Sequence, residues 1–309
     1  MLASLEGFAT ARLERLDAPA RATAAADLEA FSETILARAD LRAALTDTAT
    51  APVARGGVVG ELLRDKVGAE ARTLCVYAAS SVPAPEVPHA IEELAHAARE
   101  ASETGQLHHS SLGLLDARRR VAGFADALLD DVDTETFSSI EDDLFRWART
   151  IEGNVEIRRL LLDRDAPLAA RLGLTSQLLE GKVHPVALAL SRFVVVGGRP
   201  RDVVGTLDFL VNYVARARDW RVARVFTARR LDDATRAHLV GSLSALTGKN
   251  VELHVAEEPA LLSGVLVEIG DLRVDATTRG RLGALRDAVT SGRGLGSPTK
   301  RIGRGDRDD

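Results

Sequence analysis

The sequence predicts a mostly α-helical protein, in which an N-terminal helical bundle with an internal helix-loop-helix duplication precedes a small α/β domain. Three observations support this fold class. Apolar residues make up 46% of the 309 residues and aromatic residues only 4%, so the core has to be built from Ala, Leu and Val, which favours close helix packing. Apolar residues recur at helical spacing up to residue 220 and alternate as in strands after it. A chain of this length has room for about two domains.

The first helical region covers residues 3–45. Its large apolar residues lie broadly on one face of a helix; they are Leu28, Phe31, Ile35, Leu41 and Leu45. A loop follows, and a new helix begins with Thr50 as a possible N-cap and Pro52 in its first turn. Three prolines between residues 83 and 88 remove backbone donors, so we expect a linker there.

An internal repeat changes the interpretation of this region. A shift of 116 positions aligns residues 27–74 without gaps on residues 143–190, and about a third of the 48 aligned positions are identical. The apolar face is repeated as a face: Leu28, Phe31, Ile35, Leu62 and Leu63 correspond to Leu144, Trp147, Ile151, Leu178 and Leu179. This pattern indicates a duplicated helix-loop-helix unit that buries one stripe against its neighbours. Two copies are too few for a solenoid.

From residue 221 the pattern is that of a small α/β domain. The expected elements are, in order, a strand (221–228), a helix (231–248), a strand (250–256), a hairpin (264–276) and a closing helix (277–289). Asp232 or Asp233 can cap the first helix, and Gly270 with Asp271 forms a two-residue hairpin turn. Thr277 or Thr278 can cap the closing helix.

These patterns divide the chain into four expected parts. They are the first repeat copy (1–86), a helical bundle that includes the second copy (87–220, with the copy at 139–196), the α/β domain (221–289) and a glycine-rich, disordered tail (290–309). The sequence does not indicate a role for residues 103–137.

Charge and cysteine content exclude several classes of function. The net charge of −5 argues against a general nucleic-acid-binding protein. One basic stretch, Arg216–Arg230, leaves open a helical adaptor for protein or nucleic acid. The single cysteine, Cys75, excludes a disulfide framework. The longest apolar run is too short for a membrane span, and the N-terminus lacks the continuous apolar region of a secretory signal, so we expect a cytoplasmic protein.

Catalytic and metal-binding motifs are weak throughout. Asp130, Asp131 and Asp133 lack the glycine and final glutamate of a calcium loop. The adjacent His108 and His109 have no third ligand nearby in the sequence, and no nucleophile elbow is present. We therefore expect no catalytic residue, no metal and no cofactor, although an enzyme with an unrecognised site stays open.

The order of elements and the C-terminal motif resemble the δ subunit of F-type ATP synthases, the family of the mitochondrial oligomycin sensitivity conferring protein. The C-terminal signature of that family is matched here by Pro259, Gly264, Gly270, Asp271, Asp275, Arg281 and Leu282. Ser263 and Ala276 stand where the family usually has glycine. The resemblance covers about residues 87–289, and the extra N-terminal copy is similar to the extended δ subunits of some high-GC bacteria.

The resemblance implies a non-catalytic stator subunit. It implies that the bundle binds the catalytic head through N-terminal helices of the α subunits, next to β, and that the C-terminal domain binds the b subunit of the peripheral stalk. It also implies a peripheral position at the cytoplasmic face of the bacterial membrane, reached only through the complex, and no nucleic-acid partner. Within the bundle we expect the second copy to bind the head, around Leu144, Trp147, Ile151, Leu178 and Leu179.

Overall fold

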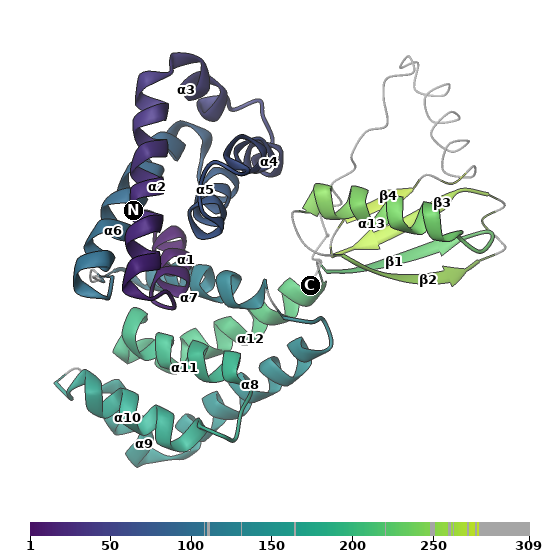
Figure 1. Cartoon of the computed structure of the whole chain (residues 1–309). Helices are drawn as coiled ribbons and strands as arrows, with labels where there is room; N and C mark the ends of the chain where they lie inside the picture. The colour runs from purple at the N-terminus through teal and green to yellow at the C-terminus, as the bar shows by residue number, and fades with distance from the viewer. Residues whose placement is uncertain are drawn as a thin grey trace, which may run out of the picture. The chain divides into compact units, whose positions relative to one another are not determined.

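The structure is a computed structural model with two compact units, Met1–Ala215 and Arg216–Asp309. It describes residues 1–107, 109, 112–130, 132–163, 165–219, 221–247, 251–258, 261, 263–270, 272–275 and 277. Figure 1 shows the helices of the first unit and the sheet of the second. The fold class is as predicted from the sequence, mostly α-helical with a small α/β part at the C-terminus. In the described residues, no helix combines the length and apolarity that crossing a bilayer requires.

The first unit contains two copies of one helical bundle. The first bundle comprises α1 (Ala3–Leu13), α2 (Ala18–Ala37), α3 (Ala39–Thr46), α4 (Pro52–Leu63), α5 (Ala69–Ser81), η1 (Ala84–Glu86) and α6 (Val87–Thr104). The second bundle comprises α7 (Leu114–Leu129), α8 (Thr136–Gly153), α9 (Val155–Leu162), α10 (Leu168–Leu179), α11 (Pro185–Gly197), η2 (Pro200–Asp202) and α12 (Val203–Asp219).

The duplication is longer than the sequence identity indicated. For example, α4 begins at Pro52 and α10 at Leu168, which is 116 positions later, and the same offset relates the ends of α1 and α7 and the starts of α6 and α12. Because α6 packs along α2, the first bundle extends to Thr104, beyond residue 86 where the sequence analysis placed its end.

Local interactions are repeated at the same offset. The rings of Phe8 and Tyr77 stack with centroids 3.7 Å apart, and those of Phe124 and Phe193 stack at 3.8 Å. The side chain of Asp27 accepts a hydrogen bond from the Gly68 N–H at 2.7 Å, just as that of Asp143 does from the His184 N–H. Matching contacts at matching positions indicate that the two bundles share one internal architecture.

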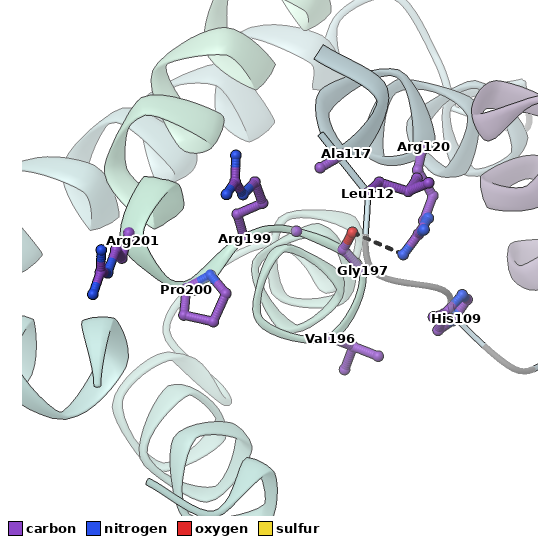
Figure 2. A pocket seen from close by; sticks show the side chains of 10 residues that line it. His109, Leu112, Ala117, Arg120, Val196, Gly197, Arg199, Pro200 and Arg201 are labelled. Carbon is purple, nitrogen blue, oxygen red and sulfur yellow. Dashed lines mark hydrogen bonds between the residues drawn. The ribbon is translucent and has the colours of Figure 1, made fainter. Parts of the chain in front are cut away.

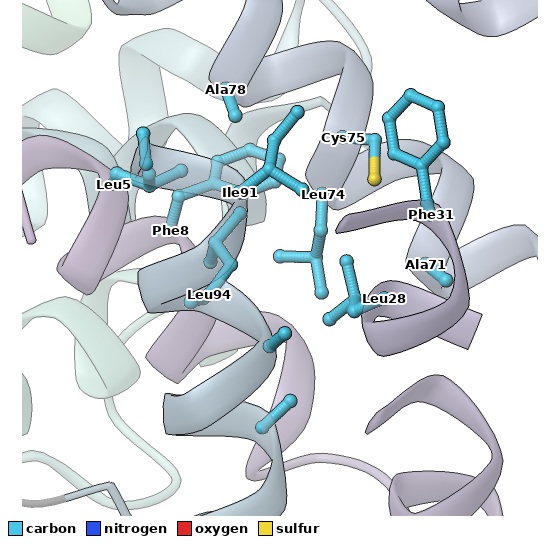
Figure 3. Close-up of a cluster of buried hydrophobic side chains, with 14 of the residues drawn as sticks. Leu5, Phe8, Leu28, Phe31, Ala71, Leu74, Cys75, Ala78, Ile91 and Leu94 are labelled. Atoms are coloured by element: carbon cyan, nitrogen blue, oxygen red, sulfur yellow. The ribbon is translucent and has the colours of Figure 1, made fainter. Parts of the chain in front are cut away.

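The core of the first bundle is assembled from small and aliphatic side chains of α1, α2, α5 and α6. Figure 3 shows ten of them by name; they are Leu5, Phe8, Leu28, Phe31, Ala71, Leu74, Cys75, Ala78, Ile91 and Leu94. The alanines allow the helices to approach closely, as the low aromatic content predicts. Cys75 is buried among them, and burial raises the pKa of its thiol. The predicted cap of α4 was wrong: its N-cap is Ala51, and the Thr50 hydroxyl donates to Asp47 instead.

The two bundles meet where α1 packs on α7, at a pair of glycines related by the repeat. A Cβ atom added at Gly7 would lie less than 3.0 Å from the carbonyl oxygen of Arg120, and one added at Gly123 would lie as close to that of Ser4. Ser4 and Arg120 also differ by 116 positions, so the contact is reciprocal. Reciprocal contacts are the mark of an approximate two-fold arrangement, and they require glycine on both helices.

Buried polar contacts across the same junction break this symmetry. The Glu6 carboxylate of α1 lies 3.2 Å from the Arg120 guanidinium of α7 and 2.9 Å from the His109 ring. Burial lowers the pKa of Arg120. Across the junction, the phenol of Tyr77 on α5 donates to the carboxylate of Asp126 on α7 at 2.8 Å. Within the second bundle, Tyr213 of α12 donates to the same carboxylate at 2.7 Å.

The second unit contains a mixed sheet in the order β2-β1-β3-β4. Its described elements are β1 (Val222–Thr227), α13 (Asp233–Thr247), β2 (Glu252–Glu257), β3 (Val265–Ile269) and β4 (Leu272–Asp275). β1 pairs in parallel with β2 and antiparallel with β3, while β3 and β4 form an antiparallel hairpin. The predicted strands, helix and hairpin are confirmed, and Asp232 caps α13 by accepting from the Thr235 N–H at 2.6 Å. The predicted closing helix and tail lie outside the described residues.

Candidate functional site

A largely apolar groove of about 490 Å³ lies between α7, α10 and α11 on the second bundle. Glu14, at the end of α1, and Leu107, after α6, also line it, so the first bundle supplies part of its rim. Phe193, the stacking partner of Phe124, lies beneath it. The apolar lining comprises Phe124 of α7, Leu168 and Leu172 of α10, and Leu188, Ala189 and Val196 of α11.

Five of the six residues of this apolar lining are replaced in the first bundle, whereas Phe124 is kept there as Phe8. In the first bundle, Pro52 stands in place of Leu168, Gly56 in place of Leu172, and Arg72 in place of Leu188. Thr73 and Ser80 replace Ala189 and Val196. A Cβ added at Gly56 would lie 3.1 Å from the Ser80 Cβ and 3.3 Å from the Val76 carbonyl oxygen, so α4 packs directly on α5. In the second bundle, Leu172 and Val196 occupy the equivalent places. The two copies therefore share a fold but differ at the surface between these helices.

A second cavity of about 250 Å³ adjoins the groove at the C-terminal end of α11 (Figure 2). Both openings are lined by His109 and Val196. Arg199 and Arg201 line the second cavity from the segment that follows α11, and Arg120 lines it from α7. The buried Arg120 guanidinium donates a hydrogen bond to the Gly197 carbonyl at 3.3 Å. The apolar groove thus continues into a cavity with a cationic lining.

The residues predicted to bind a partner lie deeper than this groove. Leu144, Trp147 and Ile151 on α8 and Leu179 on α10 are buried in the second bundle, and Leu178 is half-buried. They build the bundle whose surface carries the groove. Burial of these residues does not test whether the bundle binds a partner, so partner binding stays a prediction.

The C-terminal signature residues that the structure describes serve backbone geometry. Gly264 and Gly270 have φ angles of 92° and 55°, which favour glycine. The Asp275 carboxylate accepts from the Thr277 N–H and hydroxyl at 2.9 and 2.6 Å, and the hydroxyl hydrogen bond lowers its pKa. Ser263 does not adopt a positive φ. Pro259, Asp271, Ala276, Arg281 and Leu282 lie outside the described residues.

The sequence candidates for metal binding lie partly outside the described residues. No group of three or more His, Cys, Asp or Glu side chains is placed to hold a metal ion among these residues. His108 and Asp131 lie outside them.

The basic stretch Arg216–Arg230 is split between different environments. Arg216, Arg224, Arg229 and Arg230 are exposed, while Arg221 is buried. The adaptor function for this stretch stays a prediction, which a steep salt dependence of oligonucleotide binding would support.

Comparison with known proteins gives one consistent family. The family described as "ATP synthase delta (OSCP) subunit" matches residues 121–289, from within α7 to the C-terminal unit. The ATP synthase subunit delta of Parafrankia sp. (strain EAN1pec) is 32% identical over 269 residues, which covers 86% of each chain. That of Salinispora tropica is 31% identical over 273 residues, covering 88% of this chain and 90% of the relative. That of Streptomyces avermitilis is 31% identical over 297 residues, covering 94% and 98%.

Proposed function

The chain belongs to the ATP synthase delta (OSCP) subunit family, and on that premise we propose that it is a non-catalytic stator subunit of an ATP synthase. In this role it links the catalytic head to the peripheral stalk and resists the torque of the rotor while ATP is made. The family match begins in α7, so the second bundle and the C-terminal unit carry the part that the family shares.

We infer that the groove of the second bundle binds an amphipathic helix of the head, an N-terminal helix of an α subunit. The observation that carries this proposal is the difference between the copies: the apolar lining occurs in the second bundle and is replaced at the equivalent positions of the first. A groove between helices that is lined by aliphatic side chains is a common receptor for the apolar face of a helix. Each Leu-sized side chain buried there contributes roughly 1.5–3 kcal/mol before the cost of ordering.

The remaining assignments complete the stator. The C-terminal unit binds the end of the b subunit, and the complex holds the chain at the cytoplasmic face of the membrane. The absence of a membrane-crossing helix among the described residues is compatible with such a peripheral position. The head and the stalk are then bound by different parts of the chain, the second bundle and the C-terminal unit.

A pair of charge substitutions at equivalent positions tests the groove. Leu188→Glu places a carboxylate in the apolar lining of the second bundle, whereas Arg72→Glu places it at the matching position of the first. Native membranes are solubilised in mild detergent, the chain is captured, and the α, β and b subunits are quantified. We expect Leu188→Glu to lose α and β and keep b, and Arg72→Glu to keep all three.

Equal recovery of the head with both variants would refute the assignment of the groove. Loss of all partners with both would refute the distinction between the copies. Circular dichroism of each purified variant verifies that helix content is unchanged, since position 188 is only half-buried.

A further inference from the structure

We propose that the groove of the second bundle accepts a helix in one direction, with an acidic N-terminal turn placed against Arg199 and Arg201 and the helix running antiparallel to α11. This inference rests on the proposed function and adds the charge pattern and the orientation of the bound helix.

The groove and the cationic cavity adjoin along α11. The groove begins at Pro185, the first residue of α11, and both openings share Val196 in its last turn. The cavity then follows the chain from Gly197 to Arg201. A helix laid in the groove therefore has one end at the cationic cavity and the other near Pro185.

The charge at that end of the groove is positive. Arg199 and Arg201 are exposed, and no carboxylate belongs to the cavity lining among the described residues. The buried Arg120 is paired with Glu6, so its charge is largely offset. The nearest carboxylate of the same segment, Asp202, is held by the Arg118 guanidinium through two contacts of 3.0 Å. The two exposed arginines therefore dominate the field at this end of the groove.

The groove lining does contain one carboxylate, Glu14, and one further arginine, Arg192. Burial raises the pKa of Glu14, although a backbone hydrogen bond and the neighbouring His109 and Arg21 lower it. With Arg192 in the same lining, the groove has charges of both signs. The asymmetry along α11 comes from the cavity end.

The arginines and the apolar lining occur together in the second bundle, and both are missing from the first. Arg192, Arg199 and Arg201 correspond to Val76, Pro83 and Pro85 in the first bundle. The copy that carries the aliphatic groove thus also carries its cationic end, while the other copy has neither. The two bundles share one architecture but differ at the apolar lining and at these arginines together. This is the pattern expected if the lining and the arginines bind one ligand.

The direction follows from helix chemistry. Acidic residues stabilise the first turn of a helix, where unpaired N–H groups and the positive end of the dipole lie. A bound helix can place carboxylates against Arg199 and Arg201 without losing stability if those carboxylates are in its first turn. The N-terminus of the helix therefore lies at the arginines. Because α11 ends at this cavity, the bound helix then runs against the direction of α11.

Two synthetic peptides of identical composition test the orientation on the full chain. Both carry leucines at helical i, i+3, i+4 and i+7 spacing; one has two glutamates in its first turn and the other has them in its last turn. Fluorescence anisotropy measures their affinities at low and moderate salt. We expect the peptide with the acidic first turn to bind about tenfold more tightly, with a preference that decreases as salt screens the charges.

Variants separate this inference from the function on which it rests. We expect Arg199→Ala/Arg201→Ala to abolish the preference and retain binding, and the exposed control pair Arg42→Ala/Arg64→Ala, with the same change of net charge, to keep the preference. Equal binding of both peptides to the unmodified chain, or a preference that survives Arg199→Ala/Arg201→Ala, would overturn the orientation alone. Undiminished binding of both peptides to Leu188→Glu would instead overturn the groove itself.

Discussion

The glycine pair at the junction of the two bundles makes a quantitative prediction about stability. In Gly123→Ala, the new Cβ would lie 2.6 Å from the carbonyl carbon of Ser4 and 2.9 Å from its Cα. These are backbone atoms, so no rotamer change can relieve the contact, and α1 and α7 have to move apart. Overpacking of this kind costs up to about 3 kcal/mol, whereas Gly→Ala within a helix returns about 1 kcal/mol through propensity. We expect a net loss of about 2 kcal/mol.

The assay is thermal unfolding of the full chain followed by circular dichroism. A net loss of about 2 kcal/mol lowers the midpoint by roughly 4–8 °C for a unit of this size. The matched control is Gly57→Ala in α4, where no atom lies within 4 Å of the added Cβ; propensity alone acts there, and the midpoint should rise by roughly 2–4 °C. Because the junction is reciprocal, Gly7→Ala should resemble Gly123→Ala. A rise in midpoint for either junction variant would refute the packing described here.

Three further predictions concern a pair of turn residues, the two tyrosines and the single cysteine. Asp65 has a φ of 59° where its repeat counterpart Gly181 has 72°, so Asp65→Gly should stabilise the chain by up to about 1 kcal/mol and Gly181→Ala should destabilise it by about as much, measured by urea unfolding. Tyr77 and Tyr213 are the two tyrosines of the chain, and burial next to a shared carboxylate raises the pKa of both above the ordinary 10.0. A raised phenol pKa gives stability that is present below pH 10 and lost as the pH rises further, so phenolate absorbance should appear together with loss of helix; phenolate formation near pH 10 in a folded chain would contradict this. Cys75 is buried with a raised pKa, so a thiol reagent should react with it in denaturant and not in buffer.

The duplication detected in the sequence runs from α2 to α5, where about a third of the aligned positions are identical. It leaves out α6, where few positions match, and α1, where the match is dense but confined to a short helix. Between α6 and α12 the identical residues are Val87 with Val203, Leu94 with Leu210 and Ala101 with Ala217. A signal was present for α1, since Gly7 and Phe8 recur as Gly123 and Phe124.

The position of the groove could not be predicted from helical periodicity. A 3.6-residue repeat of apolar residues marks a face that will be covered, and it does not distinguish coverage by the same chain from coverage by a partner. Leu144 and Trp147 lie on such a face, in the copy that was chosen because it is continuous with the family-like C-terminal domain, and both are buried within the bundle. The informative positions are those where the copies differ, such as Leu188 against Arg72, because a shared core constrains both copies alike and a binding surface in one copy does not.

The hairpin, by contrast, was predictable from local chemistry. Gly270 next to Asp271, between two short apolar runs, predicts a two-residue turn, and the structure pairs Ile269 with Leu272 and gives Gly270 a φ of 55°. The departure from the family pattern at Ser263 has a simple resolution, since the positive φ angle belongs to the following Gly264.

The central claim is that the second bundle, and not the first, holds a helix of the catalytic head. Photo-crosslinking in the assembled complex tests it most directly, with p-benzoylphenylalanine introduced at position 188 in α11 or at the equivalent position 72 in α5. The account predicts a crosslink from position 188 to the N-terminal region of an α subunit and none from position 72. A crosslink to α from position 72 with none from position 188 would contradict it.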